Sequence, residues 1–436
     1  MYDAKRGKNF LRRNGLKQTF FSSIEKRKNL KNESYFYKVP DICERAAQKR
    51  KKFTHNILFS ILVPAYETKE LFFKEMLLSC LKQSYGNWEL IIADASKSDV
   101  VENTVEFYKD NRIKYKRVKT NGGISDNTNV ALKMAKGDYV CLLDHDDLLT
   151  PDALYEMAVK LDENPYLFVY SDEDKCDEKA KSFFEPHVKK EFNYDFFLSN
   201  NYICHFVSIK REIMQKNEFR AEFDGAQDYD CFLRVMEQIE SEYPDEWKDK
   251  IGHISKVLYH WRCHSGSTAA NPESKMYAYE AGRKAVEEYY RRNEIQATVM
   301  HSKHLGFYRT KFIPSIFEAR ADVGAVGNLI YRNHRVVSGP IDEITGQCIF
   351  LGLRKYYSGY MNQATCMQDV DVLDIRNMKV REECKHLLKE VIKELPKSKQ
   401  SKIYSEPLLT RNVSIAYSKK IREKGYQILF DPYFKK

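Results

Sequence analysis

The chain has 436 residues, a mass of 51.4 kDa, 43% hydrophobic residues and a formal net charge of +10. This length and composition support a buried core and leave room for more than one domain. No apolar run approaches the roughly 20 residues that a membrane-spanning helix needs, and the ten cysteines form neither a CxxC pair nor a zinc-binding spacing. We therefore expect a protein without membrane spans or a secretory leader, whose thiols lie in a reducing cytosol.

The positive charge is concentrated at the start of the chain. Residues 1–56 contain 16 lysines and arginines against 5 aspartates and glutamates, a balance of +11, so the rest of the chain is nearly neutral. A basic arm with aromatic residues could sit on an anionic membrane, so we expect a cytoplasmic protein with peripheral contact at the inner membrane face. The alternative is a helical arm that packs on the catalytic domain. Nucleic acid is not expected as a partner, because no recognition motif accompanies the charge.

From residue 57 the sequence alternates between apolar runs typical of strands and segments with apolar residues at helical spacing. The expected strands are 58–64, 88–94, 113–118 and 138–144, and the expected helices are 70–83, 101–109 and 124–136. Strands that alternate with helices favour a parallel sheet, with its functional site at the carboxyl ends of the strands. Pro64, Asp94 and Asp144 all fall at such ends.

The fourth of these strands ends abruptly in three carboxylates, Asp144, Asp146 and Asp147. Alternate residues of an extended segment share a face, so we expect Asp144 and Asp146 to point the same way. Two carboxylates at the end of a strand suit Mg²⁺ or Mn²⁺, which can carry a substrate diphosphate. Taken by itself, the cluster could also be an acidic solvated turn.

Five pieces of the chain, in order between about residues 57 and 157, together resemble the inverting family 2 glycosyltransferases of GT-A fold. They are Ser60-Ile-Leu-Val-Pro-Ala-Tyr-Glu67, Trp88-Glu-Leu-Ile-Ile-Ala-Asp-Ala-Ser96, Asn121-Gly-Gly-Ile-Ser-Asp-Asn-Thr-Asn129, Gly137-Asp-Tyr139 and Asp144-His-Asp-Asp147. The resemblance implies an α/β fold with a Rossmann-like, mostly parallel sheet and flanking helices. It also implies transfer of a sugar from a nucleotide diphosphate donor, with inversion at the sugar.

The resemblance also assigns residues to a nucleotide site. Pro64, Tyr66 and Glu67 would line the nucleoside pocket, and Asp94 would accept a hydrogen bond from the base ring. Asn129 would lie near the donor diphosphate. The residue before this asparagine is Thr128, where the family often has arginine, and this departure weakens the case for a diphosphate contact.

The metal site implied by the resemblance draws on two parts of the chain. Asp144 would lie near the ribose and the metal, and Asp146 would be the firmer metal ligand. Residues 257–268 resemble the family segment that closes over the donor diphosphate. Within it, His260 could be a third ligand as a neutral imidazole, and Arg262 could neutralise phosphate. The alternative for His260 is an interior histidine with satisfied hydrogen bonds.

Residues 225–234 begin a predicted helix, and family members carry the general base at the start of this helix. Asp228 matches that position and would take the proton of the acceptor hydroxyl. A helix N-terminus stabilises negative charge, and a plain helix cap is the alternative. Asp230 is the competing candidate for the base. A further acidic run, Asp172-Glu-Asp174, follows another apolar strand, and we expect a charged loop near the acceptor there rather than a second metal cluster.

The pattern changes beyond about residue 300. Segments 322–331 and 421–432 resemble the later half of a second transferase module, whereas the earlier half, with its strand ends and acidic box, is absent. We therefore expect a non-catalytic remnant that binds no nucleotide. The predicted domains are a basic arm over 1–56, a GT-A catalytic domain over 57–300 and a smaller accessory α/β module over 306–436.

The sequence thus predicts a metal-dependent inverting glycosyltransferase, of the hexosyl- or deoxyhexosyltransferase class, with Mg²⁺ or Mn²⁺ as its cofactor. Its donor would be a nucleotide diphosphate sugar. Its acceptor would be a hydroxyl of a saccharide or lipid-linked molecule in cell-surface polysaccharide synthesis. A sugar-nucleotide-binding or scaffold protein without turnover is the rival function. A nucleotidyltransferase is disfavoured, because the Gly-rich phosphate loop expected after the first strand is missing.

Overall fold

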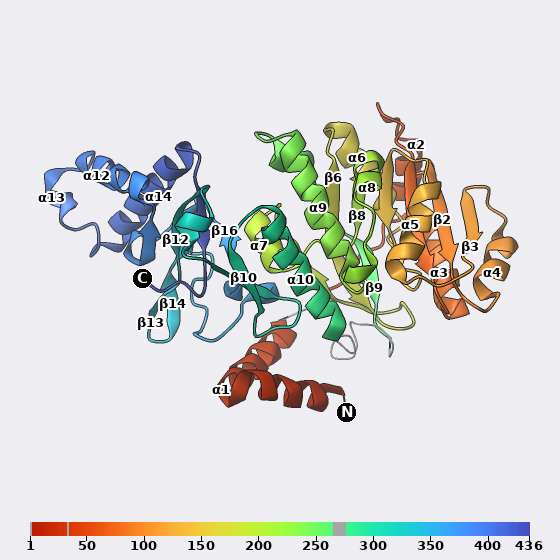
Figure 1. Cartoon of the computed structure of the whole chain (residues 1–436), viewed down its shortest axis with the longest axis horizontal. Coiled ribbons are helices and arrows are strands. Elements are labelled where there is room, and N and C mark those ends of the chain that lie inside the picture. The colour runs from red at the N-terminus through yellow and green to blue at the C-terminus, as the bar shows by residue number, and fades with distance from the viewer. Residues whose placement is uncertain (1, 33–34, 265–275) are drawn as a thin grey trace. The chain divides into compact units, whose positions relative to one another are not determined.

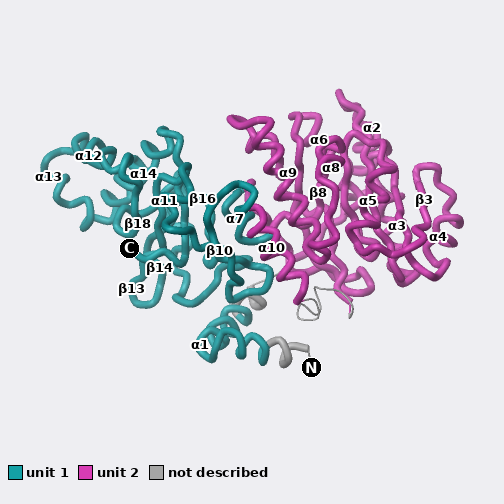
Figure 2. The backbone as a smooth tube through the Cα atoms, viewed as in Figure 1, with its two compact units in different colours: residues 1–33, 193–201, 290–436 teal, residues 34–192, 202–289 magenta. Residues whose placement is uncertain are grey.

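The computed structural model of the chain describes residues 2–32, 35–264 and 276–436. It divides into two compact units (Figure 2). Unit 2 comprises residues 34–192 and 202–289, and unit 1 comprises residues 1–33, 193–201 and 290–436. Within the described ranges, none of the helices combines the length and the apolar character needed to cross a bilayer.

Unit 2 is built on a single large sheet. Its strands are β1 Phe59–Ala65, β2 Trp88–Asp94, β3 Ile113–Arg117, β4 Tyr139–Leu142, β5 Leu148–Leu149, β6 Phe168–Cys176, β7 Phe183–His187, β8 Val207–Lys210 and β9 Ile251–Arg262. They lie in the order β3-β2-β1-β4-β8-β6-β9-β5, with β7 beside β6. Figure 1 labels β2, β3, β6, β8 and β9 of this sheet. The first four strands are parallel, β8 runs antiparallel to both neighbours, and β6 and β9 are again parallel. The carboxyl ends of β1, β2 and β4 therefore meet at one edge of the sheet.

Helices connect these strands and supply much of the core. They are α2 Ile42–Arg50, α3 Glu70–Leu81, α4 Val100–Tyr108, α5 Ile124–Met134, α6 Ala153–Glu163, α8 Arg211–Lys216 and α9 Gln227–Glu242, and α10 Met276–Arg292 runs on into unit 1. Side chains of α3 and α6 pack with alternate residues of β1 in one cluster. Every residue from Phe59 to Val63 is buried, which explains why β1 is apolar except for Ser60 rather than alternating.

The elements expected between residues 57 and 144 are present in the predicted order. β2 has the predicted bounds, and α3, α4 and α5 begin within one residue of the predicted starts. The predicted fold class, an α/β protein with a mostly parallel sheet and additional C-terminal sheets and helices, is confirmed. The fourth strand is shorter than expected, because β4 ends at Leu142 and leaves the acidic residues in a turn.

Unit 1 contains smaller sheets and several helices. Its elements are α1 Tyr2–Asn32, α7 Tyr194–Ser199, β10 Ala297–His301, β11 Tyr308–Phe312, α11 Ile316–Ala319, β12 Val323–Gly327, β13 Ile330–Arg332, β14 Arg335–Ser338, β15 Pro340–Ile341, β16 Gln368–Asp369, β17 Val372–Leu373, β18 Met378–Val380, α12 Lys385–Lys393, α13 Lys397–Gln400, α14 Pro407–Glu423 and β19 Gln427–Phe430. The central sheet has the order β16-β19-β12-β18, and α12 and α14 pack on its core. The segments 322–331 and 421–432, which resemble a second module in sequence, thus contribute the paired, parallel strands β12 and β19.

The N-terminal helix α1 belongs to unit 1 and bends at Gly15, whose φ of +76° interrupts the helix. Phe21 stacks on Tyr356 at 5.2 Å between ring centroids. The carboxylate of Glu25 accepts hydrogen bonds from the main-chain amides of Ser358 and Gly359. We expected the arm either to contact a membrane or to pack as a helix on the catalytic domain. The structure shows a helix, α1, that packs on residues of unit 1.

Candidate active site

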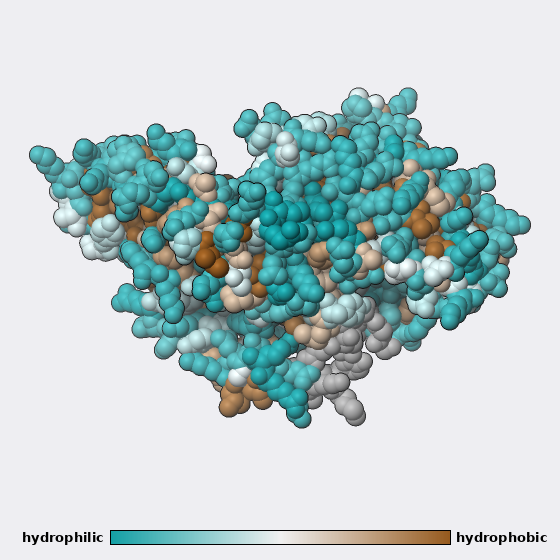
Figure 3. Space-filling view, viewed as in Figure 1, coloured by the Kyte–Doolittle hydropathy of each residue, from teal (hydrophilic) through white to brown (hydrophobic). Residues whose placement is uncertain are grey.

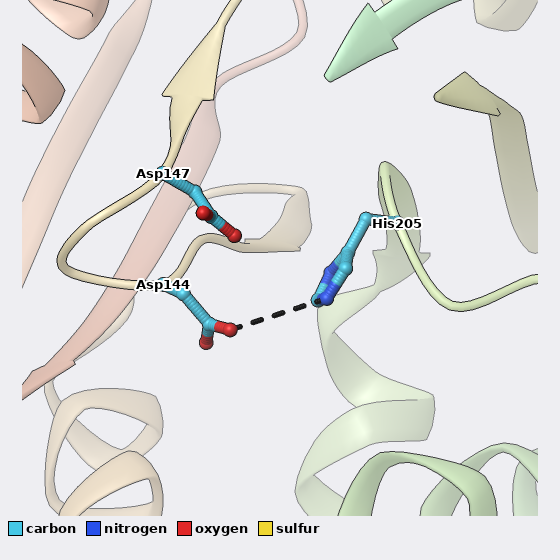
Figure 4. Close-up of side chains that lie close together, drawn as sticks. All are labelled: Asp144, Asp147 and His205. Carbon is cyan, nitrogen blue, oxygen red and sulfur yellow. Dashed lines mark ion pairs between the residues drawn. The ribbon is translucent and has the colours of Figure 1, made fainter. Parts of the chain in front are cut away.

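An acidic turn follows β4 and forms the centre of the candidate site. Asp144 and Asp147 approach one another across the turn and face His205, which precedes β8 (Figure 4). One ligand atom from each of these three residues lies within 4.8 Å of the others, and Nε2 of His205 is 4.0 Å from Oδ2 of Asp144. Two carboxylate oxygens and an imidazole nitrogen at such separations fit a divalent cation such as Mn²⁺.

The argument that strand alternation places Asp144 and Asp146 on one face does not apply, because β4 ends at Leu142, before both residues. Asp146 accepts a 2.8 Å hydrogen bond from Nε2 of His264 instead. Burial opposes its charge, but this hydrogen bond and the two nearby histidines lower the pKa of Asp146 below its ordinary value. Asp146 therefore lies beside the group formed by Asp144, Asp147 and His205, and its role as a metal ligand stays a prediction.

Asp147 is buried and held by two donors from β9. Tyr259 donates to one carboxylate oxygen at 2.5 Å, and the main-chain amide of Arg262 donates to the other at 2.7 Å. Burial raises the pKa of Asp147 well above its ordinary value, and the charges of Asp146 and Asp144 raise it further. Bringing these carboxylates together without a cation is therefore unfavourable, which is expected of a metal site.

His205 is not among the residues that the sequence predicts for the site. Its ring stacks on Tyr259, with centroids 4.5 Å apart and 9° between the planes. Its Nδ1 is buried and has no hydrogen-bond partner among the described residues. It is a single histidine in the apolar run Ile203-Cys-His-Phe-Val207, and no sequence motif links it to the acidic turn. Only the pairing of β8 with β4 brings it to Asp144.

His260 lies on β9 but outside this group. Its Nδ1 is 2.5 Å from Oδ1 of Asp174, and its ring packs against Tyr37 and Phe183. Successive side chains of a strand point to opposite faces, and the preceding residue, Tyr259, reaches the acidic turn. The structure thus shows an interior histidine with a carboxylate partner. Metal ligation by His260 stays a prediction.

Arg262 is completely buried behind the acidic turn. Its Nε donates to the carbonyl of Asp146 at 2.6 Å, and its Nη1 donates to the carbonyl of Glu178 and pairs with the carboxylate of Glu75 at 2.7 Å. The guanidinium also lies over the ring of Phe72. These contacts fix the main chain of the turn. The contact with donor phosphate stays a prediction.

The residues predicted for the nucleoside pocket follow the first strand. Pro64 is in β1, and the side chain of Tyr66 is exposed just beyond its end. Glu67 has a positive φ of 44° and accepts a 2.8 Å hydrogen bond from the amide of Lys97. Glu67 therefore joins the loops that follow β1 and β2, and it shapes the edge where the nucleoside is expected.

Asp94 ends β2 and has no exposed surface. Its carboxylate accepts hydrogen bonds from the amide of Ser96 and the hydroxyl of Tyr115, both at 2.9 Å, and lies 3.7 Å from Arg117. These partners hold the carboxylate in one orientation. A hydrogen bond from the base ring of the nucleotide would have to use a further lone pair of the Asp94 carboxylate. This hydrogen bond stays a prediction.

Asn129 is buried on α5, where its side-chain amide pairs with the main chain of Phe219. The amide N–H donates to the carbonyl of Phe219 at 2.8 Å, and the amide oxygen accepts from the N–H of the same residue at 2.9 Å. Asn129 thus joins α5 to the segment before α9. These two hydrogen bonds do not test the prediction that Asn129 lies near the donor diphosphate.

Two carboxylates near the start of α9 were candidates for the general base. Asp230 has no exposed surface and is bound by Arg220 and Arg234, so its charge is already neutralised. Asp228 is half-buried, in the first turn of the same helix. Of these two, the structure leaves Asp228 as the better candidate, and its catalytic role stays a prediction.

The charges of Asp228 and of Asp144 in the acidic turn both affect the pKa of the Cys204 thiol. Burial raises the pKa of Cys204 well above its ordinary value, and the charges of Glu173, Asp228 and Asp144 raise it further. Asp228 and Asp144 are therefore both within electrostatic reach of one thiol, next to His205 in the sequence. The candidate base and the group formed by Asp144, Asp147 and His205 both belong to unit 2.

The run Asp172-Glu-Asp174 is not the charged loop that we expected, because it lies in the buried strand β6. Asp172 binds His253 and Asp174 binds His260. Burial opposes the charge of Glu173, but its partners, Lys189 first, lower its pKa to about 2. A buried side-chain partner for each carboxylate explains how an acidic run can be a strand. The Ser267 and Thr268 end of the predicted diphosphate segment lies outside the described residues.

Comparison with known proteins decides the family. A sequence profile described as "Glycosyl transferase family 2" matches residues 60–217. The putative colanic acid biosynthesis glycosyl transferase WcaA of Escherichia coli K12 is 30% identical over 47% of this chain and 73% of its own length. The chain belongs to glycosyl transferase family 2.

Other relatives of this family 2 member are much longer or more distant. The uncharacterized protein y4gI of Sinorhizobium fredii is 38% identical over 56% of this chain, and the chain spans 27% of the length of y4gI. The crystal structure of TarS 1–349 from S. aureus aligns with a TM-score of 0.41 at 19% identity, covering 54% of this chain and 65% of TarS 1–349. The family assignment therefore rests on the sequence relationships.

Proposed function

We propose that this family 2 member is a metal-dependent inverting glycosyltransferase that uses a nucleotide diphosphate sugar. The observation that supports it most is the group of Asp144, Asp147 and His205, and Asp228 lies in the first turn of α9 in the same unit. The metal-ligand group would hold the donor diphosphate. The carboxylate of Asp228 would serve the acceptor.

In the proposed reaction, the acceptor hydroxyl oxygen forms a bond to the anomeric carbon on the face opposite the diphosphate. The bond from that carbon to the diphosphate oxygen breaks, and the nucleoside diphosphate leaves with the electron pair. Asp228 accepts the proton of the hydroxyl, which is the task of a general base. Attack from the opposite face inverts the anomeric configuration.

The remaining residues would bind and orient the donor. Asp144, Asp147 and His205, with Asp146 as the further candidate, would hold Mg²⁺ or Mn²⁺, and imidazole ligation favours Mn²⁺ of the two. When bound, the cation would offset the charge that develops on the leaving diphosphate. The neighbourhood of Pro64, Tyr66, Glu67 and Asp94 would receive the nucleoside.

We assign the acceptor to the saccharides or lipid-linked saccharides of cell-surface polysaccharide synthesis, with the name of WcaA as support. We also keep the proposed domain division, in which the part beyond residue 306 is an accessory module. Its buried strands and helices give it a core of its own. The carboxylate of Asp374 is already bound by Ser338 and Arg376. No role in nucleotide binding is assigned to it.

The test of this proposal is a screen of nucleotide diphosphate sugars with the full chain, in Mn²⁺, in Mg²⁺ and after chelation. We expect slow metal-dependent hydrolysis of one donor class and faster consumption when the acceptor is present. The anomeric configuration of the product, read by NMR, should be inverted. Saturable donor binding without any turnover would favour the rival function, a binding or scaffold protein.

We further propose that α1 makes peripheral contact with an anionic membrane face. Part of α1 packs on unit 1, whereas Lys8 and Arg12 before the bend at Gly15, and Leu16 (79% exposed) and Phe20 (62% exposed) after it, are exposed. Figure 3 shows hydrophobic surface over this helix, bordered by hydrophilic surface. Cations beside exposed apolar side chains suit a headgroup region, where each basic residue contributes on the order of 1 kcal/mol.

Vesicle sedimentation tests the membrane contact. We expect the full chain to bind vesicles rich in phosphatidylglycerol and to lose most of this binding at high salt or in the variant Leu16→Ser/Phe20→Ser. The matched control is Leu408→Ser, which changes another exposed leucine of the same unit. Equal vesicle binding by all three proteins at low salt would contradict the contact.

A further inference from the structure

A buried ion pair lies behind His205 and has no part in the proposed chemistry. Glu173 is on β6, and Lys189 is in the segment after β7; their charged atoms are 3.6 Å apart. The side chain of Lys189 has no exposed surface, and that of Glu173 is 10% exposed. Buried ion pairs are weak sources of stability, so such a pair often has another purpose.

Both members of the pair bind the main chain around Cys204. The Nζ of Lys189 donates to the carbonyls of Ile203 and His205, on either side of this residue. The carboxylate of Glu173 accepts a 3.2 Å hydrogen bond from the amide of His205. The ion pair thus holds the backbone on both sides of Cys204, through three hydrogen bonds to Ile203 and His205.

The segment that is held has an unusual backbone. Cys204 has a φ of +40°, in the left-handed region that non-glycine residues seldom adopt and that costs on the order of 1 kcal/mol or more. Such a conformation persists only where its surroundings impose it. The three hydrogen bonds from Lys189 and Glu173 supply that constraint, and the ring of His205 is directed at Tyr259 and Asp144 as a result.

We propose that the Glu173–Lys189 pair is a positioning element that holds His205 in the metal-ligand group. This inference rests on the proposed function, because it concerns the same metal site. The pair acts on the backbone of His205, and the stacked Tyr259 carries the constraint on to Asp147 through its hydroxyl. Partners that orient a metal ligand commonly change metal affinity 10–100-fold when they are removed.

Mn²⁺ binding to the full chain, measured by the loss of the free-ion EPR signal, tests this role without recourse to activity. The variant Lys189→Met removes one member of the pair, and Lys189→Met/Glu173→Leu removes both and leaves no uncompensated charge. Replacement of a whole buried pair by apolar residues is usually tolerated, so the double variant keeps the test independent of folding. The control is Lys175→Met, which breaks the more exposed Lys175–Glu185 pair at the β6–β7 hairpin.

We expect the double variant to melt cooperatively and to bind Mn²⁺ about 10–100-fold more weakly than the unaltered chain, while Lys175→Met binds normally. Adding His205→Ala to the double variant should weaken Mn²⁺ binding little further, since the histidine would already be displaced from the metal-ligand group. Normal Mn²⁺ affinity in the folded double variant, or a full additive loss from His205→Ala, would overturn the inference alone. Absence of Mn²⁺ binding in the unaltered chain would overturn the metal site and this inference together.

Discussion

The main-chain amide of Arg262 and the carboxylate of Asp147 form a 2.7 Å hydrogen bond that attaches β9 to the acidic turn. The side chain of Arg262 adds a second attachment, to the carbonyl of Asp146. Two successive residues of the turn are therefore fixed by one buried arginine. The geometry of the candidate metal site depends on this residue even if it never touches the donor.

We expect Arg262→Met to destabilise the protein by about 1–3 kcal/mol, because the carbonyls of Asp146 and Glu178 would lose their buried hydrogen bonds to the guanidinium. The measurement is thermal unfolding, together with the KM for the donor. Lys69→Met is the matched control, since it breaks the exposed Lys69–Glu178 pair and should change stability by less than about 1 kcal/mol. A normal melting temperature with a raised KM would instead mean that Arg262 binds phosphate directly.

Asp228→Asn should retain donor affinity and lose turnover. The amide has nearly the same shape as the carboxylate but cannot accept the proton, so we expect kcat to fall about 10²–10⁴-fold. Asp230→Asn is the informative comparison, because Asp230 neutralises Arg220 and Arg234 inside the protein and its loss should lower stability first. Undiminished turnover by Asp228→Asn would remove it as the base.

The attachment of α1 should weaken in mild acid because of His304. This histidine packs against Phe10, and burial, followed by the charges of Lys303 and Arg13, lowers its pKa from 6.5 to about 3. The unfolded state therefore binds more protons between these values, so stability present above pH 6.5 is lost as the pH falls through this window. At pH 5 the loss amounts to about 2 kcal/mol.

Hydrogen exchange of the amides of α1 at pH 7 and pH 5, corrected for the intrinsic rates, measures this effect. His304→Gln keeps a group that can bond Ser358, as Nε2 of the histidine does, and it should remove most of the pH dependence. His386→Gln, which alters an exposed histidine of the same unit, should leave it in place. Identical pH dependence in all three proteins would contradict the assignment to His304.

Removing the part beyond residue 305 should destabilise what remains of unit 1, because Arg320 makes two hydrogen bonds, of 2.9 and 3.1 Å, to the buried Asp195 on α7. Arg320→Met removes this pair together with the more exposed pair to Asp322, and we expect a loss of about 3–5 kcal/mol in thermal unfolding. Arg332→Met, at an exposed position of the same unit, serves as the control. Equal melting of both variants would show that the pair contributes little.

Local sequence pattern was sufficient for the first half of unit 2. The largely apolar runs of β1 and β2 could be assigned because strands covered on both faces have few polar positions, and their two polar residues, Ser60 and Glu89, are buried and bond each other. The sequence segments that end in Asp94 and Asp144 indicated the edge of the sheet where the site lies, since the carboxyl ends of parallel strands meet there.

Side-chain directions and long-range partners could not be obtained in the same way. The face on which Asp146 lies depended on where β4 ends, a matter of one or two residues. His205 reaches the site through strand order, with no local signal. The acidic residues of β6 resembled a loop because each buried partner, such as His253 for Asp172, comes from a distant segment. The docking of α1 also depended on distant residues, Tyr356 among them.

Donor turnover as a function of Mn²⁺ concentration, compared between the unaltered chain and Asp144→Asn, tests the central claim most directly. Our account predicts that chelation abolishes turnover of the preferred nucleotide sugar and that Mn²⁺ restores it. It also predicts that Asp144→Asn, although folded, needs at least about 10-fold more Mn²⁺ for the same rate, because one anionic ligand is lost. Turnover that survives chelation, or an unchanged Mn²⁺ requirement in Asp144→Asn, would contradict it.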